Sequence, residues 1–167
     1  MFNIFILLTS IIFIGTPCLS NIKFAADTLS IELPHTIIAS GNTHFYNNKN
    51  IDISANTFQY NTKTALGNFH QNVLLKYKNA TLTSQYVSID INKKQLIGQN
   101  DIILQSKKIY ATAKEFTITN HEIITLKKNV KVKRNGSQIR SNELIYNLKN
   151  DTIISNERVK IKLQIDK

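Results

Sequence analysis

The most constraining feature of this chain is an internal repeat of 28 or 29 residues. Each unit starts with a small residue, has an apolar residue three positions later, and has a larger apolar or aromatic residue two positions after that. The five small residues are Ala26, Ala55, Ser84, Ala113 and Ser141. One such unit cannot bury its apolar face alone, so the repeat predicts units that stack along one axis around a shared interior.

A second series of polar residues keeps nearly the same period between the first positions. Its members are Asn42, Asn72, Asn100, Asn129 and Arg158, each near the start of a strand-like run. Two independent features with one period are unlikely to coincide by chance, which strengthens the interpretation as a true repeat.

The runs inside each unit have the chemistry of β-strands. Apolar and polar residues alternate, as in residues 130–133, and Thr, Ile, Val and Tyr are frequent, whereas helical apolar spacing is not sustained after residue 20. Asn135-Gly136 is the sharpest of several hairpin signals. The three-residue step after each small residue breaks the alternation and predicts a bulge or corner where a strand passes from one sheet to another. The repeat alone allows a β-helix-like solenoid or an antiparallel jelly roll of two facing sheets.

The first twenty residues predict export. Residues 1–20 contain no charged side chain, and their apolar run is shorter than the roughly 20 residues of a membrane-spanning helix. Small residues at Cys18 and Ser20 fit cleavage after Ser20, which predicts a signal peptide at 1–20 and one domain at 21–167. An uncleaved anchor and a lipid attached to Cys18 are the alternatives.

The repeated units, each followed by a Gly/Asn-x-Val type of strand, resemble the OstA-type domain of the LptA family of periplasmic lipopolysaccharide-transport proteins. The resemblance covers about residues 26–165, and it is blurred at Thr43, Asp101 and Arg158. It implies an all-β fold, a twisted open β-jelly roll built from about five repeats of 28–29 residues. It also implies a periplasmic carrier that takes lipopolysaccharide from the inner to the outer membrane. The implied partners are lipopolysaccharide, further copies stacked head to tail, and LptC-like inner-membrane and LptD-like outer-membrane proteins at the two ends.

A carrier of acyl chains needs an apolar wall, because each buried CH₂ contributes roughly 0.8 kcal/mol. The inward-facing positions of the repeat are the candidates for lipid binding. They are Leu29, Ile31, Phe58, Tyr60, Val73, Leu75, Val87, Ile89, Ile102, Leu104, Phe116, Ile118, Val130, Val132, Leu144 and Tyr146. Residue for residue, the better interpretation is that they fill a closed, packed core, and the sequence does not separate a lined groove from such a core.

The two ends of the repeat are candidate edges for self-association. Apolar and polar residues alternate toward the end of the chain, where no Pro blunts the strand, and a short strand before Pro34 is the matching first edge. The predicted edge residues are Thr28, Ser30, Val159, Ile161, Leu163 and Ile165. Pairing of two different ends predicts an open filament.

The net charge of +10 favours an anionic partner, but its location matters. Lys131 and Lys133 alternate with valines, and Lys160 and Lys162 alternate with apolar residues, so pleating sends all four to the outer face. The sequence shows no concentrated basic face, and together with the export signal this argues against nucleic-acid binding.

No motif for catalysis, a cofactor or a metal is recognisable. The four histidines His35, His44, His70 and His121 are far apart and have no second ligand at metal-binding spacing. We therefore expect no enzyme, cofactor or metal site. The alternatives to a carrier are a β-solenoid enzyme acting on polysaccharides and an LptC-like acceptor of lipopolysaccharide anchored in the inner membrane.

Overall fold

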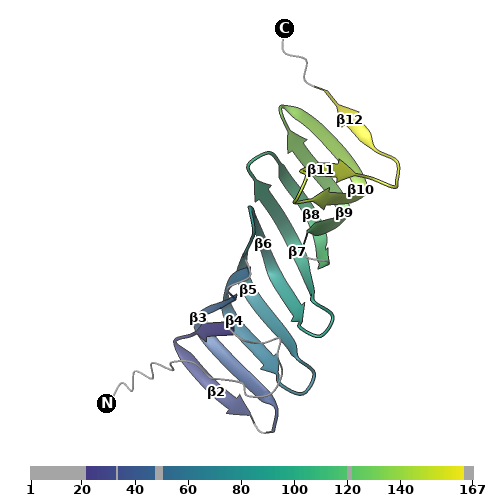
Figure 1. Ribbon diagram of the computed structural model, residues 1–167. Coiled ribbons are helices and arrows are strands. Elements are labelled where there is room, and N and C mark those ends of the chain that lie inside the picture. Colours follow the sequence, from purple (N-terminus) through teal and green to yellow (C-terminus); the bar gives the residue numbers. More distant parts are fainter. Residues whose placement is uncertain (1–21, 33, 48–50, 120–121, 164–167) are drawn as a thin grey trace.

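The computed structural model describes residues 22–32, 34–47, 51–119 and 122–163, and these residues form strands and turns (Figure 1). The strands are β1 (Ile22–Ala25), β2 (Thr28–Glu32), β3 (Thr36–Asn47), β4 (Ile51–Asn61), β5 (Leu66–Tyr77), β6 (Ala80–Asp90), β7 (Gln95–Ser106), β8 (Tyr110–Thr119), β9 (Ile123–Arg134), β10 (Ser137–Asn147), β11 (Thr152–Ile154) and β12 (Lys160–Lys162). The predicted all-β class is confirmed.

All strands belong to one antiparallel sheet in which β3 to β10 follow each other as hairpins. A β-helix-like solenoid would pair its strands in parallel. The antiparallel pairing seen here therefore excludes the solenoid and leaves the open jelly roll. The sheet runs as a long twisted ribbon from β2 at one end to β12 at the other (Figure 1).

At each end of the sheet, the position of the outermost strand is occupied by two short strands. Both β1 and β2 pair with β3, one on each side of its midpoint, and β11 and β12 pair with β10 in the same way. Asp27 lies at the first split, where its backbone N–H donates to the carbonyl of Gly41 and its carboxylate accepts a bond from Asn42.

Every long strand bends at its middle, where the pairing register shifts. In β3, β5, β7 and β9 the bend is a pair of residues with positive φ: Gly41-Asn42, Gln71-Asn72, Asn100-Asp101 and Lys128-Asn129. In the intervening strands the repeated small residue lies there, and Ala55, Ser84 and Ala113 are buried inside the bend. The predicted corner is confirmed. The Asn series marks the same line, since Asn tolerates the left-handed region better than most residues.

The line of corners divides the sheet into two halves that face each other. Half A contains β1, β12 and the described residues within 43–55, 73–84, 102–113 and 130–141. Half B contains β2, β11 and the described residues within 36–40, 57–70, 86–99, 115–127 and 143–147.

Aromatic rings join the halves. Phe45 of half A lies 6.1 Å from Phe58 and 5.7 Å from Phe69 of half B, measured between ring centroids. The jelly roll is thus one sheet folded on itself, rather than two separate sheets, because β3 to β10 each continue through their corner.

Candidate functional site

The interior between the halves is lined by apolar rows that cross the whole sheet. Each row is a chain of directly opposed residues on neighbouring strands. The row in half A is Phe45, Ile53, Leu75, Leu82, Leu104, Ala111, Val132, Ile139 and Ile161. Half B has two rows. The first is Leu29, Ala39, Phe58, Phe69, Val87, Gly98, Phe116, Leu126 and Leu144, and the second is Ile31, Ile37, Tyr60, Gly67, Ile89, Leu96, Ile118, Ile124, Tyr146 and Ile153.

Most residues predicted to line the interior are buried on its inner side. The buried ones are Phe58, Val73, Leu75, Val87, Ile89, Ile102, Leu104, Phe116, Ile118, Val130, Val132, Leu144 and Tyr146. Tyr60 is partly buried against them. Leu29 and Ile31 differ, because they begin their rows on the outermost strand β2 and are 37% and 61% exposed.

The repeat pattern missed the part of most strands that precedes the corner, and it missed β3 altogether. Phe45, Ile53, Phe69, Leu82 and Leu126 are as deeply buried as the predicted residues, yet they lie outside the small-x-x-apolar segments. The signal that would have found them is the two-residue alternation seen in runs such as 73–77, applied along the whole length of each strand.

The interior is filled by these side chains. Four of the largest, Tyr77, Tyr146, Phe69 and Phe116, are less than 2% exposed. A narrow hollow at the N-terminal end, beside Ala39, Phe45, Phe58 and Phe69, has no room even for a water molecule. Small-molecule sites enclose roughly 300–1,000 Å³, so an acyl chain needs the halves to part.

The side opposite the corner line is where hairpin turns of the two halves meet, and we call it the mouth. Polar contacts cross it, and together they form what we call the polar seam: Lys78, Ser106, Lys108, Glu122, Arg134, Tyr146 and Asp151. Lys78 in the turn after β5 lies 3.7 Å from Glu122 in the turn before β9. About one repeat later, Lys108 lies 2.6 Å from Asp151.

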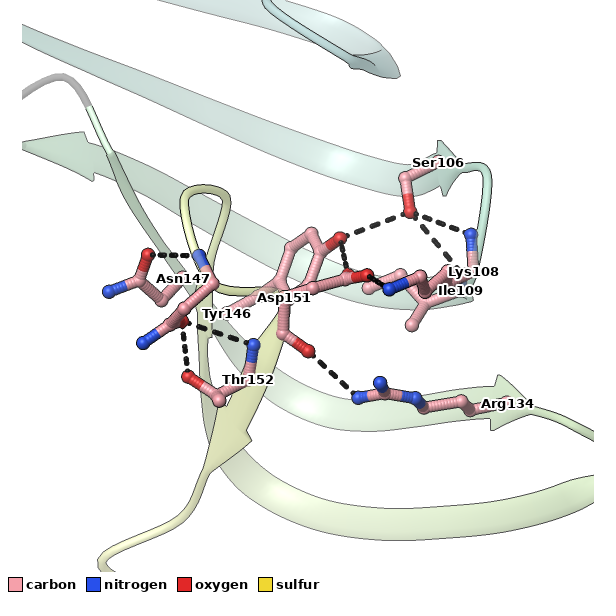
Figure 2. A network of polar contacts seen from close by, with 9 residues as sticks. Ser106, Lys108, Ile109, Arg134, Tyr146, Asn147, Asp151 and Thr152 are labelled. Carbon is pink, nitrogen blue, oxygen red and sulfur yellow. Dashed lines mark hydrogen bonds and ion pairs between the residues drawn. The ribbon is translucent and has the colours of Figure 1, made fainter.

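Asp151 is the centre of the seam (Figure 2). Its carboxylate accepts a 2.5 Å bond from the Tyr146 hydroxyl, and its backbone carbonyl accepts a 2.9 Å bond from Arg134. The Tyr146 hydroxyl also lies 3.2 Å from Ser106 Oγ, which reaches across from half A. These contacts hold the C-terminal part of the mouth closed.

The seam shifts the acidity of its two central groups. The bonds from Lys108 and Tyr146 lower the pKa of the Asp151 carboxyl, because both stabilise the carboxylate. Burial, together with the adjacent Asp151 carboxylate, raises the pKa of the Tyr146 hydroxyl. At neutral pH the pair is therefore a neutral phenol donating to a carboxylate.

Within the described residues, β2 at one end of the sheet and β12 at the other are paired on one side only. Thr28 and Ser30 are exposed on β2, and at the other end Ile161 and Leu163 are 60% and 68% exposed. β12 covers Lys160–Lys162 only; Val159 precedes it, and Ile165 lies outside the described residues. Ile161 therefore ends the apolar row of half A at one edge, and Leu29 and Ile31 begin the rows of half B at the other edge.

The expectation about basic charge needs a correction. The outer-face position predicted for Lys131, Lys133, Lys160 and Lys162 is confirmed, because all four are exposed. However, β9, β10 and β12 are neighbours, so the sheet gathers these lysines with Arg140 into one basic area. The sequence showed alternation within each strand but not which strands pair.

Among the residues described, no three His, Cys, Asp or Glu side chains lie close enough together to hold a metal ion. No helix in the described part of the chain has the length and apolar character needed to cross a membrane.

Residues 52–152, more than half of the chain, match the family described as LptA/(LptD N-terminal domain) LPS transport protein. The chain belongs to this family. The match extends from the start of β4 into β11, and so includes most of the rows and the polar seam.

A solved structure is also similar, at low identity. It is LptH from Pseudomonas aeruginosa, described as the LptA homologous periplasmic component of the conserved lipopolysaccharide transport device. Identity is 10% and the TM-score 0.36, with 86% of this chain and 95% of that chain covered. No curated protein matches the chain.

Proposed function

We propose that this protein is a periplasmic carrier of lipopolysaccharide, not an enzyme, and that its interior holds the acyl chains. The observation that carries the proposal is the family match over residues 52–152, which coincides with three apolar rows. Residues 1–20 would act as the export signal, leaving a mature domain from residue 21.

Uptake requires the halves to part at the mouth. The contacts that resist parting at the surface are exposed or half-exposed ion pairs, which typically contribute about 0–1 kcal/mol each. The larger resistance is the mutual burial of side chains such as Leu104 and Phe116. A bound acyl chain replaces that burial, at roughly 0.8 kcal/mol per CH₂ or about 10 kcal/mol for a dozen carbons.

The edge strands at the two ends of the sheet would make the carrier part of a bridge. Half A of one copy would end at β12 and continue at β1 of the next copy, while half B would end at β11 and continue at β2, from Ile153 toward Ile31. Different surfaces then meet at each contact, which gives a head-to-tail filament. The proposed end partners are an LptC-like inner-membrane protein and an LptD-like outer-membrane protein.

A matched pair of photo-crosslinkers tests lipid binding. Tyr60 faces the interior and Tyr110 faces outward, where it is 42% exposed. Each is replaced by p-azidophenylalanine, which differs from tyrosine mainly at the ring tip. We expect crosslinks to lipopolysaccharide from position 60 and few from position 110. Equal crosslinking, or none at position 60, contradicts the proposal; mass spectrometry of co-purified lipid is an independent check.

Sedimentation velocity tests the bridge. The wild type should assemble as its concentration rises, and Ile161→Pro should weaken assembly because proline interrupts the ladder of an edge strand. Ile161→Thr is the control, since threonine keeps the backbone N–H and suits a strand. A wild type that stays monomeric at every concentration refutes head-to-tail pairing.

A further inference from the structure

Five exposed cations lie together on the outer face of half A at its C-terminal end. We call this surface the basic face. Its members are Lys131 and Lys133 of β9, Arg140 of β10, and Lys160 and Lys162 of β12.

The register sets like charges opposite each other. Lys131 lies across from Arg140, which lies across from Lys160 on its other side. Two residues further along the strands, Gln138 lies across from Lys133 on one side and from Lys162 on the other. Directly opposed like charges destabilise a sheet, so this arrangement is unfavourable in the isolated protein.

The described residues offer the basic face no carboxylate at ion-pair distance. Cations nearer the corner are neutralised: Lys127 lies 3.0 Å from Glu143, and Lys128 lies 2.6 Å from Glu115. Paired and unpaired lysines both occur on β9, so the overall charge of the chain does not explain the difference. The uncompensated potential is therefore local and favours an anionic surface.

An apolar and aromatic border adjoins the basic face. Tyr110, 42% exposed, lies across from Lys133, and Ile103, 37% exposed, lies across from Thr112, which neighbours Lys131. Exposed tyrosine beside cations is typical of surfaces that rest at a membrane–water interface.

We propose that the basic face docks the protein onto the surface of a bilayer that contains anionic phospholipids. Four of its five cations are lysines, whose ammonium groups are point charges on flexible stems. They suit a diffuse layer of lipid phosphates, whereas arginine forks suit the fixed carboxylates of a protein partner. Each cation near an anionic membrane contributes about 1 kcal/mol, and five together give reversible attachment. This docking is independent of lipid carriage in the interior.

Vesicle sedimentation tests the docking. The protein is produced with its own N-terminal segment, purified as the cell processes it, and mixed with phosphatidylglycerol/phosphatidylethanolamine vesicles free of lipopolysaccharide. Phosphatidylcholine vesicles serve for comparison. The test variant is Lys131→Gln/Arg140→Gln/Lys160→Gln. The control, Lys63→Gln/Lys94→Gln/Lys149→Gln, removes the same charge from exposed turns of half B.

We expect the test variant to lose on the order of 100-fold in partitioning to anionic vesicles at low salt, and the control to lose far less. Binding should fall as salt rises, because the charges are screened. Inorganic phosphate should compete no better than sodium chloride of equal ionic strength. The proposal is overturned if both variants lose binding equally, or if the protein binds phosphatidylcholine vesicles equally well. It is also overturned if the protein does not bind anionic vesicles, and an acidic protein is then the partner that remains.

A fluorescence measurement reports the orientation without altering any of the five cations. The chain contains no tryptophan, so Tyr110→Trp and Tyr86→Trp each give a single probe, on half A and half B respectively. Adding anionic vesicles should shift the emission of the first to shorter wavelength and leave the second unchanged. A shift at position 86 alone contradicts docking through the basic face.

Discussion

At the residue scale, Gly98 in the first row of half B has less room for a side chain than Gly41 or Gly67. It lies between Val87 and Phe116, and a Cβ built on Gly98 would come within 1.9 Å of Phe116 Cε1. The ring of Phe116 is fully buried and occupies the space that a side chain at position 98 would need. The missing side chain is thus what lets a large aromatic residue fit the interior here.

We therefore predict that Gly98→Ala destabilises the protein by about 1–3 kcal/mol, the usual range for overpacking a core. Urea unfolding monitored by circular dichroism measures the change. Adding Phe116→Leu should recover part of the loss, because leucine vacates ring positions next to the new methyl group. An alanine variant as stable as the wild type would show that Phe116 moves freely, which its burial argues against.

The corner residues show what the sequence could and could not predict at this scale. The series of Asn42, Asn72, Asn100 and Asn129 was visible as a period, but nothing in the sequence assigned it positive φ. In the structure the series lies on the corner line, next to the small residues of the other series. Two separate patterns in the sequence therefore have one physical cause.

At the scale of elements, the polar seam ties turns that are far apart in the chain. Lys78 meets Glu122, and Lys108 meets Asp151, across the mouth. Asp151 is the group whose pKa the seam lowers, so its contribution to stability has a defined pH dependence.

A carboxyl group with a lowered folded-state pKa adds stability that is present above its unfolded pKa, about 3.9, and is lost as pH falls through the folded value. We predict that wild type exceeds Asp151→Asn in stability by a constant amount from pH 7 to about pH 5. The difference should shrink below about pH 4. Thermal unfolding of both proteins across this range measures it, and a difference unchanged at pH 2 would mean that the charge of Asp151 does not contribute.

The seam and the basic face were beyond sequence analysis for the same reason. Alternation predicted correctly that Lys131 and Lys160 point outward, because that depends on one strand at a time. Their proximity depends on which strands pair with β10, and Lys78 with Glu122 depends on how the sheet folds at the corner. The fold class, the corner and most buried positions followed from local pattern, whereas contacts between distant elements needed the structure.

At the scale of the whole molecule, the interior and the mouth form one system. The rows are continuous from Leu29 to Leu144 and from Phe45 to Ile161, but side chains fill the space between them. A lipid carrier with this filled interior must part its two halves to take up an acyl chain. The polar seam crosses the mouth, the side on which no strand runs from one half into the other. Loading of lipid should therefore depend on freedom of the mouth.

Covalent locking of the seam tests this dependence. In a Cys18→Ser background, which has no other cysteine, Lys78→Cys and Glu122→Cys are joined by a short flexible bismaleimide. We predict that the locked protein takes up lipopolysaccharide much more slowly, and that the same double variant without the reagent loads at least as fast as the Cys18→Ser parent. The control joins Thr64→Cys to Asn92→Cys, two turns of half B whose residues are hydrogen-bonded at 3.3 Å. That link leaves the mouth free, so equal loading of the two locked proteins would mean that lipid enters by another route, such as the ends of the rows.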